Sequence, residues 1–254
     1  FYQAHLDDIA HRHPPLLLVH GAGGTHLYWP PQLRHLSGFD VYALDLPEHG
    51  RSEGRGRARI EDYREVIYAV ADALRLHPFV LCGHSMGGAI GLDLALTYPE
   101  KLAGLVLIST GARLRVARDI LDGILNDYTG TLRLIADWAY GSAPSERMRQ
   151  LYVERMQENR PRVILDDFRA CDVFDIMDRV EQVRHPTLLI CGGNDRLTPP
   201  RFSRYLQDHL PNAQLVEFLQ AGHMVMLEHP EEVIEAITEF VHALSMGVTA
   251  RRAA

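Results

Sequence analysis

Short, continuous apolar runs recur along the chain, and each ends in a turn rich in glycine or polar residues. The runs that predict buried strands cover residues 16–19, 39–44, 80–82, 102–108, 187–191 and 214–219. Between them, apolar residues recur at helical spacing, as in residues 61–76 and in a last helix that begins at Pro230. Strands that are apolar throughout and alternate with amphipathic helices are typical of a parallel sheet covered on both faces. The pattern therefore predicts an α/β fold.

One long stretch departs from this alternation. Residues 113–183 mix many Arg, Asp and Glu with Leu, Ile, Tyr and Trp138, and they contain no clear strand. We interpret them as a helical insertion over the carboxyl edge of the sheet, placed before the penultimate strand. The predicted division is a core of residues 1–112 and 184–245, a helical cap of residues 113–183, and a disordered tail of residues 246–254. Residues 1–10 carry only a faint strand pattern.

Composition narrows the range of partners. The 254 residues carry a net charge of −7, which argues against a nucleic-acid partner. No apolar run approaches the roughly 18 residues that span a bilayer, and residues 1–13 do not resemble a signal peptide. A chain that starts at Phe1 without Met leaves a removed leader open. The small odd number of cysteines, Cys82, Cys171 and Cys191, predicts reduced thiols and a cytoplasmic location.

Metal and cofactor chemistry finds little support in the sequence. His11 and His13 lie close together, but no partner residues for a shared metal ion can be identified. We therefore predict neither a metal nor a cofactor.

The sequence Gly83-His84-Ser85-Met86-Gly87 separates an apolar strand from a helix rich in small residues. A Gly-x-Ser-x-Gly between strand and helix is typical of a sharp turn that exposes a nucleophilic serine. Glycine on either side leaves room for the strained backbone of the central residue. Ser85 is the predicted nucleophile.

A serine nucleophile requires a base, and the base requires an acid that orients it. In an open parallel sheet, groups that converge lie on loops at the carboxyl ends of strands. His223 follows the last predicted strand, and Asp195 follows the penultimate one. These two are the predicted base and acid, whereas structural roles are favoured for His20 and Asp45. The loop after the strand at residues 102–108 offers no alternative acid.

Attack of a serine on a carbonyl carbon forms a tetrahedral intermediate that carries an oxyanion. Two N–H donors are needed to stabilise this oxyanion. One is expected from the amide of Met86, the residue after the nucleophile. The other is expected from the glycine-rich loop at residues 20–24, with Ala22 preferred and Gly23 as the alternative.

Together these motifs resemble the α/β-hydrolase superfamily over nearly the whole chain. The matching pieces are His20-Gly21-Ala22-Gly23, Asp45-Leu46-Pro47 with His49-Gly50-Arg51-Ser52, the Ser85 pentapeptide, Gly193-Asn194-Asp195, and Gly222-His223 with Glu228-His229-Pro230. The chain order Ser85, Asp195, His223 is the order of that family. The resemblance implies a capped, esterase-like serine hydrolase. The family commonly has glycine at the position of Glu48.

The predicted function is hydrolysis of a small carboxylic ester or lactone through an acyl-enzyme on Ser85. Relatives with the same triad cleave C–C bonds, amides or thioesters or act as haloperoxidases, and some scaffolds of this type are ligand receptors, so these alternatives stay open. A mainly apolar pocket is expected. Its candidate residues are Trp29, Trp138, Tyr140, Phe174, Met177 and Met224.

Overall fold

A seven-stranded sheet forms the centre of the protein. The computed structural model describes residues 1–7, 13–142 and 144–247. The strands are β1 (Tyr2–His5), β2 (Leu16–Val19), β3 (Val41–Leu44), β4 (Phe79–His84), β5 (Leu102–Ile108), β6 (Thr187–Gly192) and β7 (Ala213–Phe218). Their order across the sheet is β1-β3-β2-β4-β5-β6-β7. Only β1 pairs antiparallel, against β3, and the other neighbours within the described residues are parallel.

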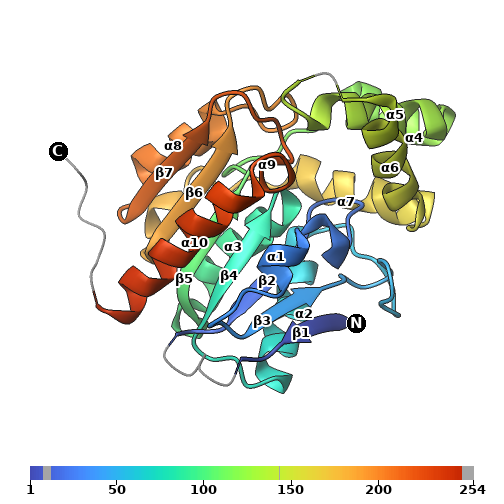
Figure 1. Ribbon diagram of the computed structural model, residues 1–254. Helices are drawn as coiled ribbons and strands as arrows, with labels where there is room; N and C mark the ends of the chain where they lie inside the picture. Colours follow the sequence, from blue (N-terminus) through green and yellow to red (C-terminus); the bar gives the residue numbers. More distant parts are fainter. Residues whose placement is uncertain (8–12, 143, 248–254) are drawn as a thin grey trace.

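Helices cover both faces of the sheet (Figure 1). The α-helices are α1 (Pro31–Arg34), α2 (Ile60–Ala73), α3 (Met86–Thr97), α4 (Arg118–Asn126), α5 (Tyr128–Ala139), α6 (Glu146–Gln157), α7 (Pro161–Val173), α8 (Arg201–His209), α9 (Val225–Glu228) and α10 (Pro230–Ser245). Short 3-10 helices are η2 (His26–Tyr28), η3 (Pro99–Lys101) and η4 (Val180–Gln182). One face packs against α1 and α10, and the other against α2, α3 and α8.

The apolar strands explain why two hydrophobic clusters form. Successive side chains of a strand point to opposite faces, so a strand without polar residues contributes to both clusters. In β2, Leu16 and Leu18 join one cluster, whereas Leu17 and Val19 join the other. Such strands require helices on both sides, as observed. The predicted α/β-hydrolase fold, with a mostly parallel sheet, is confirmed.

The helices α4, α5, α6 and α7 lie between β5 and β6 in sequence, and they gather at one end of the sheet (Figure 1). We refer to these four as the inserted helices. They coincide with the stretch that lacked a strand pattern, although the division into core and cap domains stays a proposal.

Element ends shift slightly from the sequence-based expectation. The last strand covers Ala213–Phe218 rather than residues 214–219, and the faint N-terminal pattern corresponds to β1. Of the predicted tail, residues 248–254 lie outside the described residues. Among the described residues, none of the helices combines the length and apolar character that a membrane crossing requires.

Candidate active site

Ser85 occupies a strained turn between β4 and α3. Its backbone has φ 52° and ψ −115°, in the half of conformational space that favours glycine. The turn is tight because a Cβ atom at Gly83 would lie 2.4 Å from the Gly87 carbonyl oxygen, and one at Gly87 would lie 2.1 Å from that of Val19. Neither position can hold a larger residue without moving the backbone. The pentapeptide therefore fixes Ser85 at the carboxyl end of the central strand.

Asp195 and His223 form a buried pair on the loops that follow β6 and β7. His223 Nδ1 lies 2.8 Å from Asp195 Oδ2, and each residue is 4% exposed. The other carboxylate oxygen, Oδ1, accepts hydrogen bonds from the Leu197 and Thr198 amides, each at 2.8 Å. Both oxygens are thus held in place. The pairing leaves Nε2 of His223 for a reacting group.

Thr198 is a polar partner of this pair that the sequence analysis did not identify. Its hydroxyl lies 2.7 Å from Asp195 Oδ2, 3.1 Å from His223 Nδ1 and 2.9 Å from the Ser109 carbonyl oxygen. A threonine three residues after an aspartate is a turn signal that could have drawn attention to it. Thr198 ties the acid and the base to the end of β5.

His84 supports the backbone of the base. Its Nε2 donates to the His223 carbonyl oxygen at 3.1 Å, and the two rings lie 4.7 Å apart between centroids. Because a carbonyl can only accept, His84 carries its proton on Nε2. Burial, reinforced by neighbouring histidines, lowers the pKa of His84 well below its usual value, so the ring stays neutral.

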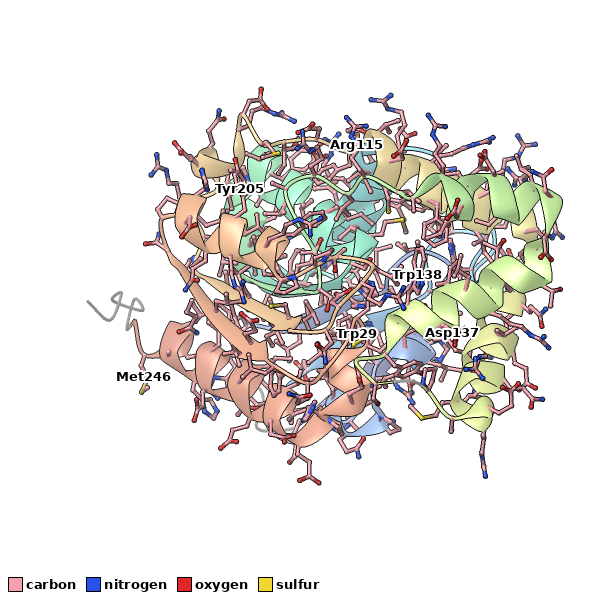
Figure 2. The ribbon with its side chains drawn as sticks, turned by 90° about the horizontal axis from the view of Figure 1, so that it is seen from above. Trp29, Arg115, Asp137, Trp138, Tyr205 and Met246 are labelled. Carbon is pink, nitrogen blue, oxygen red and sulfur yellow. The ribbon has the colours of Figure 1, made fainter. Side chains whose placement is uncertain are left out.

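A cavity of about 370 Å³ opens where these elements meet. It lies between the carboxyl ends of the strands and the inserted helices, and both Ser85 and His223 line it. The remaining lining is mainly apolar and aromatic, from Ala22, Tyr28, Leu114, Val116, Ile120, Ile135, Trp138, Tyr152, Phe168, Leu197 and Phe202. Arg115, Arg196 and Arg201 also belong to the lining. Trp138 lies near the end of α5 (Figure 2). The Arg196 guanidinium lies over its ring.

Most of the residues suggested for the pocket lie elsewhere. Of the six, only Trp138 lines the cavity with Ser85, and Tyr140 lines a neighbouring, more open hollow. Trp29 and Met224 are fully buried in the cluster on one face of the sheet, and Phe174 and Met177 pack with the cluster on the other. Apolar character and nearness to the motifs do not separate a cavity lining from a core, because core packing uses the same residue types. The structure replaces them with Tyr28, Tyr152 and Phe168, whose helical or loop positions carry no motif.

The loop at residues 20–24 distinguishes between the two suggested oxyanion donors. The Gly23 amide donates to Asp167 Oδ2 at 2.8 Å, so this N–H is already used. Ala22 lines the cavity, and Met86 is the first residue of α3. Within the described residues, neither of their N–H groups has a hydrogen-bond partner. The contacts therefore favour Ala22 over Gly23.

His20 and Asp45 contact the surrounding loops. His20 Nδ1 lies 2.8 Å from the Gly21 carbonyl oxygen, while its Nε2 accepts from the Leu46 amide at 3.0 Å. Burial lowers the pKa of His20 to about 4, and the neutral ring fits both contacts. Asp45 binds the amide and Nδ1 of His26, at 2.7 and 2.8 Å. Neither His20 nor Asp45 lines the cavity with Ser85.

No group of three or more potential metal ligands occurs among the residues that the structure describes. His11 lies outside those residues, and His13 stacks on Phe39.

Comparison with known proteins identifies the family. Residues 16–236 match the model of the "Alpha/beta hydrolase family". The chain belongs to this family. A pimeloyl-[acyl-carrier protein] methyl ester esterase of Nitrosomonas europaea is 30% identical over 87% of this chain and 93% of that protein. This α/β-hydrolase also resembles a thermophilic esterase, with 32% identity, a TM-score of 0.78 and 90% coverage of both chains. Est816, an N-acyl homoserine lactone degrading enzyme, is 25% identical, with a TM-score of 0.83 and coverage of 95% and 96%. The predicted family and the assignment as a hydrolase are confirmed.

Proposed function

We propose that this α/β-hydrolase cleaves small carboxylic esters or lactones through an acyl-enzyme on Ser85. The observation that carries the proposal is the buried Asp195–His223 pair, which opens onto the same cavity as Ser85. A base held by an acid beside a serine is the arrangement that activates a hydroxyl for acyl transfer.

The proposed reaction has two halves. Ser85 Oγ attacks the carbonyl carbon while its proton passes to Nε2 of His223, and Asp195 stabilises the resulting imidazolium through Nδ1. The Ala22 and Met86 amides bind the oxyanion. Collapse of the tetrahedral intermediate breaks the bond to the leaving oxygen, which takes the proton from His223. Water then repeats these steps on the acyl-enzyme, releasing the acid and restoring Ser85.

The cavity lining restricts the substrate class. It is mainly apolar, and its charged residues are Arg115, Arg196 and Arg201. No aspartate or glutamate occurs among the described residues that line it. We therefore expect neutral or anionic esters to be preferred over cationic ones. The relatives include a methyl ester esterase and a lactone degrading enzyme, which supports esters and lactones as the first substrates to test.

Thioesters, amides and C–C bonds are alternatives because the same groups can attack those carbonyls, and a haloperoxidase or a ligand receptor would use the same scaffold. Multiple turnover of simple esters would separate an enzyme from a receptor.

We also propose a cytoplasmic location and no nucleic-acid partner. The three cysteines are free and buried, which suits a reducing compartment, and the net charge of −7 opposes nucleic-acid binding.

The decisive experiment compares the wild-type protein with Ser85→Ala on a panel of p-nitrophenyl esters, lactones and thioesters. We expect the wild type to hydrolyse short or medium esters and to be labelled covalently by a fluorophosphonate, and the variant to lose both properties. Labelling or turnover that survives in Ser85→Ala would refute the proposed nucleophile.

A further inference from the structure

Asp167, a residue of α7, is a fully buried carboxylate outside the cavity that holds Ser85. Its Oδ2 accepts from the Gly23 amide and faces His49 Nε2, both at 2.8 Å, and its Oδ1 accepts from the Tyr63 hydroxyl at 2.6 Å. A buried charge is costly unless its hydrogen bonds are made. All three donors come from outside the inserted helices, so this carboxylate joins α7 to two sheet loops and to α2.

His49 acts as a donor in this contact. Burial lowers the pKa of His49, but the charge of Asp167 and the hydrogen bond to it outweigh that effect, so the pKa is raised overall. His49 Nδ1 lies 3.0 Å from the Pro47 carbonyl oxygen, which can only accept. Both ring nitrogens thus face acceptors, and the contact to Asp167 is charge-assisted.

Asn159, between α6 and α7, holds the other side of Gly23. Its Nδ2 donates to the carbonyl oxygens of Gly23 at 2.8 Å and of Gly24 at 3.3 Å. Its Oδ1 accepts from the Gly50 amide at 2.8 Å. Asn159 is 3% exposed. Helix α7 and the α6–α7 loop therefore hold both the N–H and the C=O of Gly23. We call Asp167 and Asn159 the Gly23 clamp.

Gly23 requires such support. Its φ is +64°, and a Cβ atom there would lie 2.6 Å from the terminal carbon of Met156 on α6. Glycine has no side chain that could anchor the loop, and its backbone visits many conformations when it is not held. The Gly24 amide belongs to the same peptide as the Gly23 carbonyl group, and it donates to the Gly21 carbonyl oxygen. A rotation of that peptide would therefore remove a support of the Gly21–Ala22 peptide.

The Gly21–Ala22 peptide, which carries the Ala22 N–H, is held through its carbonyl oxygen. The Gly21 carbonyl oxygen accepts from the Gly24 amide at 3.1 Å and from His20 Nδ1 at 2.8 Å. In a trans peptide, the C=O of Gly21 and the N–H of Ala22 point in opposite directions, so anchoring the oxygen aims the N–H. His20 thus anchors this peptide directly, and the Gly23 clamp supports it through Gly23 and Gly24.

We propose that Asp167 and Asn159 are positioning residues that hold the Ala22 amide in the oxyanion hole, so that full activity depends on the docked inserted helices. The inference rests on the proposed function, because it requires that the Ala22 amide stabilise an oxyanion. A clamp that served only to dock α7 would contribute to the free energy of unfolding and leave turnover per folded molecule unchanged.

The experiment measures kcat and KM with p-nitrophenyl butyrate for wild type, Asp167→Ala and Asn159→Ala, per site titrated with a fluorophosphonate. Removing one oxyanion donor costs on the order of 10²–10³ in rate, and misplacing one costs less. We expect kcat to fall about 10- to 100-fold in either variant, with KM within about threefold of the wild type. Affinity for a trifluoromethyl ketone, which forms a hemiketal oxyanion on the serine, should fall by a similar factor.

Two control variants separate positioning from docking. Tyr63→Phe removes the hydrogen bond to Asp167 Oδ1 without touching the Gly23 contact, and it should lower Tm while kcat stays within about threefold. Asp166→Asn changes the neighbouring carboxylate, which pairs with Arg162, and it should behave as the wild type. Asp167→Asn keeps an acceptor for Gly23 and should recover part of the lost kcat.

Several outcomes would overturn the inference. One is a kcat loss in Asp167→Ala and Asn159→Ala that is no larger than in Tyr63→Phe. Another is an unchanged affinity for the trifluoromethyl ketone. If Asp167→Ala fails to fold, Asn159→Ala and Asp167→Asn decide the matter. If the wild type neither hydrolyses esters nor reacts with the fluorophosphonate, the proposed function fails; an active wild type with fully active clamp variants refutes the clamp alone.

Discussion

The two halves of the candidate active site are built in different ways. The acid–base half consists of Asp195, Thr198 and His223, whose groups lie on the loops after β6 and β7 and are at most 28 residues apart. The oxyanion half depends on contacts across the chain, since Gly23 and Asp167 are separated by 144 residues. The hydrogen bonds among the first three residues stay within the sheet loops, although the neighbouring Met224 amide donates to the Ala139 carbonyl oxygen of α5 at 3.0 Å. In the second half, Gly23 itself is held at both its N–H and its C=O by Asp167 and Asn159. We therefore expect docking of the inserted helices to matter more to the oxyanion half.

The largest effect is expected from Asp195→Asn, which changes the acid–base half. An amide at this position can no longer stabilise the imidazolium of His223, and the equivalent change in a serine protease lowers kcat roughly 10⁴-fold. We expect a comparable loss in kcat, with Tm within a few degrees of the wild type. Steady-state kinetics and a thermal melt check this. A loss smaller than tenfold would mean that another group serves as the acid.

Acid conditions should lower the free energy of unfolding through His20, whose ring holds the Gly21 carbonyl oxygen. Burial lowers the pKa of His20 from its usual value of 6.5 to about 4. Between these values the unfolded chain binds the proton and the folded protein does not, so the free energy of unfolding rises with pH across this window and falls on acidification. The shift corresponds to about 3 kcal/mol. His84, whose pKa is also lowered by burial, acts in the same direction.

Urea unfolding of wild type and His20→Gln at pH 7, 6, 5 and 4 isolates this contribution. The variant lacks the titrating ring, so its free energy of unfolding should fall less between pH 6.5 and 4 than that of the wild type. Subtracting the free energy of unfolding of the variant from that of the wild type at each pH removes the contribution of the carboxylates, which titrate in both proteins. Parallel pH dependences would show that His20 is not the buried neutral base inferred here.

The difference between the two halves also explains what the sequence could predict. Asp195 and His223 could be located because each follows a predicted strand. In an alternating series of strands and helices, the loops after the strands lie together at the carboxyl edge of the sheet. Asp166 and Asp167 are adjacent acids in an amphipathic helix. Asp166 pairs with Arg162, whereas Asp167 is fully buried and accepts from the Gly23 amide. Nothing in the local sequence distinguishes the two roles. Only packing of the inserted helices makes that difference.

Glu48 shows an intermediate case. The sequence identified it as a departure from the family's glycine, and the structure gives the reason for that glycine, since φ at this residue is +65°.

The pocket could not be predicted because apolar side chains of the inserted helices serve cavity and core alike. Phe168 lines the cavity, whereas Phe174, six residues later, packs into a hydrophobic cluster.

Glu48→Gly tests whether every contact to the inserted helices matters. The Glu48 carboxylate lies 2.8 Å from Arg162, an exposed side chain, and accepts from the Gly56 amide at 2.9 Å. Exposed ion pairs contribute little, and glycine would relieve the unfavourable φ. We expect Tm to change by less than about 3 °C and kcat to stay within about twofold. A kcat loss like that of the Gly23 clamp variants would show that the loop at residues 45–52, rather than Gly23 itself, controls the oxyanion half.

The smallest effect is expected at the cavity rim, which neither half controls. Arg196 lines the cavity and is exposed, and its guanidinium lies over the ring of Trp138. Arg196→Gln should raise KM about threefold for the p-nitrophenyl monoester of glutaric acid and leave p-nitrophenyl valerate unchanged, because an exposed charge contributes at most about 1 kcal/mol. The difference should shrink in 0.5 M salt, where exposed charges are screened. Arg147→Gln, an exposed change on α6 away from the cavity lining, is the control. Equal effects of Arg196→Gln on both esters would show that this arginine shapes the rim by packing on Trp138 and does not select anionic substrates.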